Sequence, residues 1–178
     1  MKSNVRMRFF PVLLLLTFLG AATPSHAHLM KADHGTLNFK DESVFMVLSL
    51  PASVFGSADE DNDRLLSPTE FSKYQVQLVD DVERSVILSA GTVSMTLEGV
   101  ILNLDQPHDA PESPAANVVV LGKYSLSNTR YPLEFAVHFF DGGEDSHSIE
   151  VTASRKNEGL SHVFDVSSKT PSVRLDIK

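Results

Sequence analysis

The 178-residue sequence contains no cysteine. This absence excludes disulfide bonds, zinc sites built on thiolates and catalysis by a thiol nucleophile. A domain of this chain must therefore be held together by its hydrophobic core, with or without the help of a metal ion bound through oxygen or nitrogen atoms.

Basic residues are scarce as well. The chain has 15 lysines and arginines against 23 aspartates and glutamates, which gives a formal net charge of −8. Because a nucleic-acid partner requires a basic footprint that neutralises phosphates, this composition argues against nucleic-acid binding. An acidic surface instead suits a protein that attracts cations.

Long apolar runs are absent apart from one near the N-terminus. Residues 9–19 are apolar except for Pro11 and Thr17, follow three basic residues and precede a stretch of small residues that ends at Ala27. This arrangement is typical of a secretory signal peptide over residues 1–27, with cleavage after Ala22 as the alternative. The run falls short of the about 20 apolar residues that a membrane-spanning helix needs.

The sequence therefore predicts a soluble, exported protein, periplasmic or secreted, with no membrane span after cleavage. Removal of residues 1–27 takes away three basic residues and no acidic one, which changes the formal charge from −8 to −11. The remaining length, residues 28–178, suits a single domain with a proper core. The absence of cysteine favours a bacterial periplasm.

Common catalytic motifs are also missing. The sequence has no G-x-S-x-G elbow, no H-E-x-x-H pair and no glycine-rich phosphate loop. Asp80 and Asp81 are adjacent, so on a helix they would point in different directions and would not converge on one substrate atom. We therefore expect a non-enzymatic protein, with an enzyme whose site is assembled from distant loops as an open alternative.

What the sequence does contain is an acidic segment, DEDNDRLLSPTE, at residues 59–70. Acidic side chains fall at positions 1, 3, 5 and 12 of this segment, the spacing by which an EF-hand loop surrounds Ca²⁺ with oxygen ligands. Over the loop and its immediate flanks the chain resembles the EF-hand family, and the resemblance implies a single calcium site. The expected ligands are Asp59, Asp61, Asp63, the Leu65 carbonyl, Ser67 or a water that it holds, and Glu70.

One position departs from the EF-hand pattern. Position 6 is Arg64, where the family has glycine because the chain turns sharply there with φ > 0. A residue with a Cβ adopts that conformation at a cost of about 1–2 kcal/mol, and Arg64 also brings a positive charge near the ion. We expect weakened calcium binding, which is still useful outside the cell, where sites of about 10⁻⁴–10⁻³ M affinity function.

The flanks of the loop predict a helix that follows it. Ser67, Pro68 and Glu70 supply an N-cap, a proline at the first helical position and a capping box. The apolar periodicity continues this helix from about Pro68 to Arg84, whereas an entering helix has room only for Ala52 to Ser57. Because a single loop lacks the paired geometry of calcium sensors, we expect the ion to have a structural role.

Two interpretations compete with calcium binding. Segments rich in Asp and Asn are often ordinary solvated turns, because these side chains bond their own backbone. The other interpretation is a degenerate calcium loop that is retained only as a turn. A chance turn need not combine Glu at position 12, an aliphatic residue at position 8 and a helix cap at position 9, which favours the calcium site.

The rest of the chain predicts β-structure. Nine or so short segments alternate between apolar and polar residues and are separated by turn residues, with Val93, Met95 and Leu97 expected to face the core together. This pattern predicts a mainly β, antiparallel, immunoglobulin-like sandwich into which residues 52–84 are inserted. The expected strands are Thr36–Phe39, Val44–Leu50, Val86–Leu88, Thr92–Leu97 with its continuation Val100–Leu104 beyond a bulge at Gly99, Val118–Leu126, Tyr131–Phe140, Ser148–Arg155, Leu160–Val166 and Val173–Ile177.

The processed N-terminus offers an alternative function. If cleavage follows Ala27, the mature protein begins with His28, whose α-amine and imidazole together chelate Cu²⁺ or Ni²⁺. His34 is the nearest second ligand. A periplasmic protein that binds or delivers a transition metal is therefore the alternative to the calcium protein, and a frayed polar terminus is the competing interpretation.

A broader resemblance rests on His28, Asp59–Asp63 and Leu66–Phe71. In these residues the chain is similar to the extracytoplasmic N-terminal region of membrane proteins in the hydrogenase- and urease-accessory permease group. Those proteins continue into transmembrane helices, and this sequence has none after residue 27, so transport is not carried over. The resemblance implies a soluble relative associated with metal handling or with a membrane-protein partner.

Overall fold

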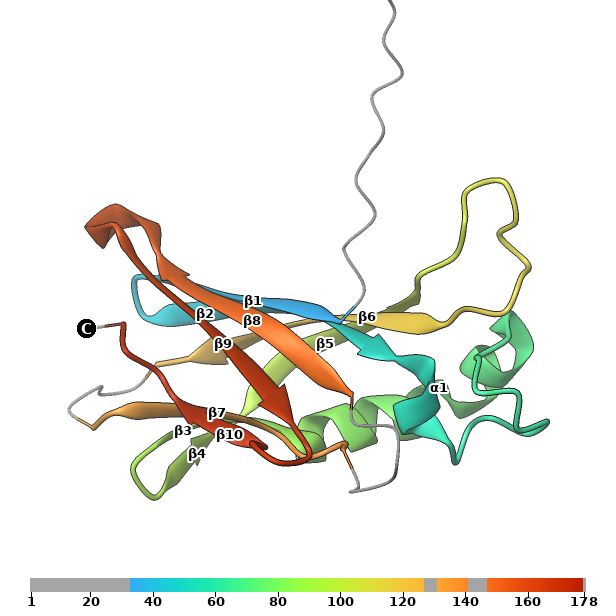
Figure 1. The fold of residues 1–178 in the computed structure, drawn as a ribbon, viewed down its shortest axis with the longest axis horizontal. Coiled ribbons are helices and arrows are strands. Elements are labelled where there is room, and N and C mark those ends of the chain that lie inside the picture. The colour runs from blue at the N-terminus through green and yellow to red at the C-terminus, as the bar shows by residue number, and fades with distance from the viewer. Residues whose placement is uncertain (1–32, 127–130, 141–146, 178) are drawn as a thin grey trace, which may run out of the picture.

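A computed structural model describes residues 33–126, 131–140 and 147–177 of the chain. The predicted signal peptide, both of its candidate cleavage sites and His28 lie outside the described residues (Figure 1).

Two β-sheets face each other, and one helix lies along their side (Figure 1). The six-stranded sheet has the order β5-β6-β2-β1-β8-β9, and the four-stranded sheet has the order β10-β7-β3-β4. This arrangement confirms the predicted mainly β, sandwich-like fold with one helix. The larger sheet contains β1 (His34–Lys40), β2 (Ser43–Pro51), β5 (Leu97–Leu104), β6 (Asn117–Ser125), β8 (Ser148–Arg155) and β9 (Leu160–Ser167), and the smaller one contains β3 (Val86–Ala90), β4 (Val93–Met95), β7 (Leu133–Val137) and β10 (Ser172–Arg174).

Among the described residues the strand pairs are antiparallel with one exception, in which β1 runs parallel to β8. Two of the antiparallel pairs are hairpins. Lys40 at the end of β1 pairs with Ser43 at the start of β2, and Ala90 at the end of β3 pairs with Val93 at the start of β4. The parallel pair has no such local origin, because parallel neighbours need a long connection rather than a tight turn.

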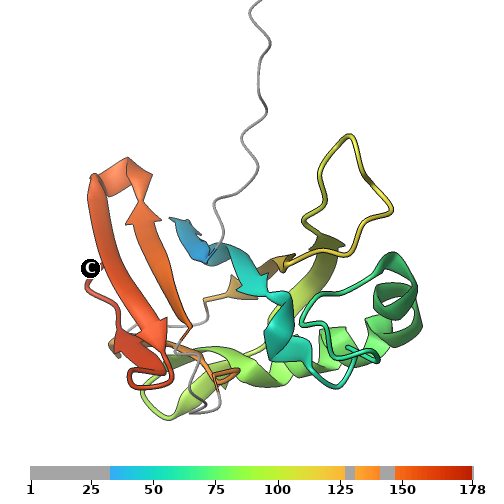
Figure 2. The same cartoon turned by 45° about the vertical axis from the view of Figure 1, so that its right-hand side comes forward.

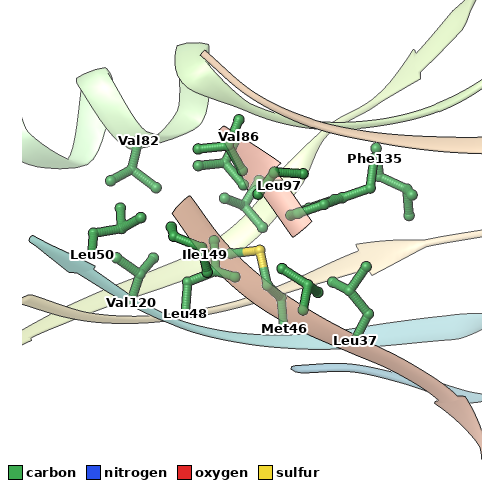
Figure 3. Close-up of a cluster of buried hydrophobic side chains, with 14 of the residues drawn as sticks. Leu37, Met46, Leu48, Leu50, Val82, Val86, Leu97, Val120, Phe135 and Ile149 are labelled. Atoms are coloured by element: carbon green, nitrogen blue, oxygen red, sulfur yellow. The ribbon is translucent and has the colours of Figure 1, made fainter. Parts of the chain in front are cut away.

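The core fills the space between the sheets, where the inner residues of each strand alternate with outer ones (Figure 3). Met46 and Ile149 from the larger sheet face Phe135 from the smaller sheet, and each is 1% exposed or less. Tyr124 adds a polar link between the sheets, because its hydroxyl donates a hydrogen bond of 3.0 Å to the carbonyl of Val86. Burial raises the pKa of Tyr124 far above its ordinary value, so the hydroxyl keeps its proton.

One predicted strand, Thr92–Leu97, is wrong as a single element. It divides between two sheets, because β4 ends at Met95 and Leu97 already belongs to β5 of the larger sheet. Val93, expected in the core, is 65% exposed, whereas Leu97 is 4% exposed. An alternation of apolar residues cannot reveal this change of sheet, because the period of two continues across it.

Other predicted strands are shorter or less regular in the structure. A register shift between Glu98 and Ile101, with Gly99 at φ +61°, confirms the expected bulge. The last predicted strand ends at Arg174, although Leu175 and Ile177 beyond it are buried.

The helix α1 (Pro68–Ser85) agrees closely with the predicted one and leads directly into β3. Leu78 and Val82 on its inner face are fully buried, while Phe71 and Tyr74 are partly buried against the core. Before the acidic loop, the expected entering helix is one 3₁₀ turn, η1 (Ala52–Phe55). Within the described residues, no helix is both long and apolar enough to cross a membrane.

Two substitutions on α1 test this account of the core. Leu78→Ala should lower the free energy of unfolding by about 2–5 kcal/mol, because it leaves a cavity at a residue with 0% exposure. Val76→Ala on the same helix should change it by less than about 0.5 kcal/mol, because Val76 is 78% exposed. Chemical denaturation measures both, and equal effects would contradict the assigned helix orientation.

Candidate metal site

The acidic loop ends at the N-terminus of α1, where a complete capping box fixes its geometry. The Glu70 backbone N–H donates to the Ser67 hydroxyl at 3.2 Å, and the Ser67 backbone N–H donates to Glu70 Oε2 at 2.9 Å. The Ser67 hydroxyl also donates to Glu70 Oε2 at 2.7 Å. The predicted N-cap is confirmed, and it satisfies two backbone groups that a bare helix end would leave open.

The same Glu70 carboxylate closes the loop from its other end. Its second oxygen, Oε1, accepts a hydrogen bond of 2.8 Å from the backbone N–H of Glu60, ten residues earlier. The side chain is 8% exposed. The hydrogen bonds, first of all that from the Ser67 hydroxyl, hold the pKa of Glu70 below its ordinary value. Glu70 is thus an ionised clamp that joins the second, ninth and twelfth residues of the loop.

Three aspartates gather within this closed loop. One carboxylate oxygen from each of Asp59, Asp61 and Asp63 lies within 4.8 Å of the other two, so the group could hold a metal ion. Partial loss of hydration raises the pKa of Asp61, and the negative charges of Asp63 and Glu70 act in the same direction. A cation placed among these oxygens would relieve that repulsion.

Backbone hydrogen bonds to the aspartates give the loop its curvature. Asp59 accepts from the N–H groups of Asp63 at 3.2 Å and Arg64 at 2.9 Å, and Asp63 accepts from Leu65 at 2.7 Å. Arg64 has φ +66°, the left-handed conformation expected at position 6. The expected strain of a Cβ at this position is therefore present in the structure.

The side chain of Glu60 makes a second contact between the acidic loop and α1. Glu60 accepts a hydrogen bond of 2.8 Å from the Tyr74 hydroxyl and pairs with the ammonium group of Lys73. The contact with Lys73 is the main reason why the pKa of Glu60 lies below its ordinary value. Both partners lie one turn into α1, so the loop is fastened along the helix as well as at its cap.

The apolar residue at position 8, Leu66, pairs with a different part of the chain. Leu66 and Ala115 form an antiparallel bridge with two backbone hydrogen bonds of 3.0 and 2.9 Å, and both residues are almost completely buried. The next residue, Ala116, accepts a hydrogen bond from Ala52 at 2.8 Å. Figures 1 and 2 show the acidic loop and the loop over residues 105–116 at the same end of the molecule. Apart from its apolar character in a polar segment, Leu66 gives no sign of this partner in the sequence.

The structure brings together part of the predicted ligand set. Asp59, Asp61 and Asp63 form one group, and Glu70 is not a member of it. Both Glu70 oxygens accept hydrogen bonds from loop and cap donors. The Ser67 hydroxyl likewise donates to Glu70. An all-oxygen group of three carboxylates fits a hard cation rather than a soft one.

Of the two histidines proposed for the alternative transition-metal site, the structure describes His34. His34 lies in β1, and its Nε2 is 3.1 Å from Glu150 Oε1 on the parallel neighbour β8. The other proposed ligand, His28, lies outside the described residues.

A scan against protein-family models gives no match to this chain, and a search of curated proteins gives none either.

The hydrogen bonds accepted by the Glu70 carboxylate predict a pH dependence of the free energy of unfolding. In metal-free protein, Glu70→Gln should lower the free energy of unfolding at neutral pH by about 1–3 kcal/mol, because an amide group would face donors that need an acceptor. A carboxylate with a depressed folded pKa stabilises the fold above its unfolded pKa, and this stabilisation is lost as the pH falls through the folded pKa. The difference between wild type and variant should therefore shrink towards acidic pH.

Denaturation series across pH, recorded with a chelator present, measure this difference. Glu83→Gln is the matched control, because Glu83 is an exposed residue of the same helix. A difference between wild type and Glu70→Gln that stays constant from neutral to strongly acidic pH would contradict the role of Glu70.

Proposed function

We propose that this chain is an exported, non-enzymatic protein that binds one Ca²⁺ in the loop over residues 59–70. The observation that carries the proposal is the group of three aspartate oxygens within 4.8 Å on a loop whose ends are already closed. The residues that would hold the ion are Asp59, Asp61, Asp63, the Leu65 carbonyl, Ser67 or a water that it holds, and Glu70.

The choice of Ca²⁺ rests on the chemistry of these donors. Every one of them is an oxygen, and Ca²⁺ takes six to eight oxygen ligands in flexible geometry, whereas Mg²⁺ demands a stricter octahedron. The three aspartates supply the negative charge. The Leu65 carbonyl, Ser67 or its water, and Glu70 would complete the coordination number of the ion. Glu70 would have to share its oxygens between the ion and its present donors.

The ion's proposed role is structural. The loop connects η1, at the end of β2, to α1, which leads without a break into β3 of the smaller sheet. A cation would neutralise the crowded carboxylates and hold the helix against both sheets. Because it binds the folded loop and not the unfolded chain, it would stabilise the fold by mass action, by about 2.7 kcal/mol at a free concentration of a hundred times the Kd.

The proposed location follows from the signal-like N-terminus and from the charge of −11 that remains after its removal. Outside the cytoplasm calcium is plentiful, so a site of modest affinity is occupied. A single loop bridged to Ala115, rather than to a second calcium loop, suits a permanent structural ion better than a sensor.

Calcium titration tests the proposal directly. Ca²⁺ should give a saturable heat of binding and raise the thermal midpoint of the wild-type protein, and Asp61→Asn should weaken the binding at least tenfold because it removes one of three clustered charges. Asp80→Asn on the exposed side of α1 is the control and should bind like wild type. The absence of a heat signal, or equal binding by Asp61→Asn, would overturn the calcium site.

The departure at position 6 provides a second test. Arg64→Gly should raise calcium affinity severalfold, because it removes a positive charge next to the aspartates. It should also relieve the strain at φ +66°. Arg64→Lys keeps both the charge and the Cβ and should bind as wild type does. Isothermal titration of the three proteins measures the difference, and an unchanged affinity in Arg64→Gly would show that Arg64 does not limit binding.

A further inference from the structure

Residues 175–177, which follow β10, close one side of the sandwich. The strands β9 and β10 are edge strands of the larger and the smaller sheet, and they contact each other. In Figures 1 and 2 these residues, drawn in red, rise from β10 toward the larger sheet. Leu175 and Ile177 are each 4% exposed and belong to the hydrophobic core. This closing segment therefore covers the core where the two sheet edges meet.

Two backbone N–H groups of the closing segment donate hydrogen bonds, one to each sheet. That of Leu175 donates at 2.8 Å to the carbonyl of Leu133 in β7 of the smaller sheet. That of Asp176 donates at 3.1 Å to Nδ1 of His162 in β9 of the larger sheet. The closing segment is thus tied to the larger sheet through an imidazole ring.

The hydrogen bond from Asp176 fixes the protonation state of His162. A backbone N–H can only donate, so Nδ1 must offer a lone pair. The bond therefore requires the neutral imidazole with its proton on Nε2. A second proton on the ring would place an N–H at Nδ1 opposite the N–H of Asp176, and the bond would be lost.

His162 lies at an inner position of β9. Its cross-strand partner is Ala153 of β8, which is 0% exposed, and its ring centroid is 5.2 Å from that of Phe164. Phe164 and Val166, the next inner residues along β9, are apolar and buried. A histidine in this row makes the packing of the sheet edge depend on the charge of one side chain, because a protonated ring favours water over an apolar surface.

The other charged side chains of β9 and of the elements that contact it are exposed or already paired. On β8, Arg155 lies 3.3 Å from Glu158 of the 3₁₀ turn η2 (Lys156–Glu158), and Glu150 lies 3.1 Å from His34. The exposed ones are Asp165 of β9, Lys156 of η2, Glu134 of β7, Arg174 of β10 and Asp176 of the closing segment. Carboxylates, lysine and arginine keep their ordinary charge between pH 5 and 8, where histidine changes its own.

We propose that His162 is a pH-dependent latch for the closing segment. The neutral imidazole holds residues 175–177 between the sheets, and protonation in a mildly acidic medium releases the N–H of Asp176 and loosens the segment. The bond to Leu133 and the apolar packing of Leu175 and Ile177 remain, so protonation raises the frequency of local opening rather than detaching the segment. The latch depends neither on the calcium site nor on the export of the protein.

Amide hydrogen exchange between about pH 8 and pH 5 tests the proposal. The rates are expressed as protection factors, which remove the intrinsic dependence of exchange on pH. The protection factor of the Asp176 amide should fall about three- to tenfold over this range, because that is the effect of losing one hydrogen bond. Val120 is fully buried in β6, which does not neighbour β9 in the sheet, so its amide should keep its protection. An equal fall at both amides would overturn a local latch.

Two substitutions of His162 separate the acceptor from the charge. His162→Asn places an amide oxygen near the position of Nδ1 that accepts at every pH, so the protection of Asp176 should no longer depend on pH. His162→Leu removes the acceptor, so the protection should be low throughout. His108→Gln is the control, because His108 is exposed on the loop over residues 105–116, and it should behave like wild type.

Thermal unfolding verifies that each variant folds. Nitrogen-15 NMR of the wild-type imidazole gives a reading that needs no variant: Nδ1 of His162 should carry no proton at pH 8, and a proton there would overturn the proposal. Protection of Asp176 that stays constant or rises toward pH 5 would overturn it as well, since an ion pair between protonated His162 and the Asp176 carboxylate would have that effect. Retention of the wild-type pH dependence in folded His162→Asn would overturn the role of His162.

Discussion

The carboxylate of Glu70 is the contact on which the arrangement of the acidic loop and the helix depends. One oxygen accepts from the backbone of Glu60, and the other accepts from the backbone and the hydroxyl of Ser67. These bonds fix where the loop ends and where α1 begins. Because β3 follows α1 without a connecting loop, the position of the helix also determines where the smaller sheet starts.

Contacts with distant segments of the chain also hold the acidic loop and α1 in place. The bridge between Leu66 and Ala115 ties the loop to the segment that enters β6, and Ala116 ties the same segment to the start of η1. At the other end of the helix, Tyr124 of β6 bonds to Val86 at the start of β3. Contacts with β6 or with the segment that enters it therefore hold the chain at both ends of α1. Apolar side chains pack between these two points. A cation in the loop would add to a framework that hydrogen bonds already define.

The larger sheet has a different character on its two faces. Its inner face supplies much of the core, and its outer face carries the row from Ile101 to Val163. An apolar inner face follows from the need to bury surface. The apolar row on the outer face does not follow from that need.

The sequence by itself determined those features whose contacts lie within a few residues of one another. The helix, its capping box, the bulge at Gly99 and the left-handed position at Arg64 were all predictable, because local hydrogen bonds and steric limits decide them. The acidic spacing likewise placed Asp59, Asp61 and Asp63 together, because a tight loop brings alternate residues to one side.

Only the tertiary structure decided the contacts between distant segments. The parallel pairing of β1 with β8, the change of sheet between Met95 and Leu97, and the bridge from Leu66 to Ala115 leave no periodic signal, since many strands with the same alternation could exchange partners. The row of outward-facing residues from Ile101 of β5 to Val163 of β9 depends on the same information. Its residues come from six separate strands and form one surface only because the register of five strand pairs aligns them.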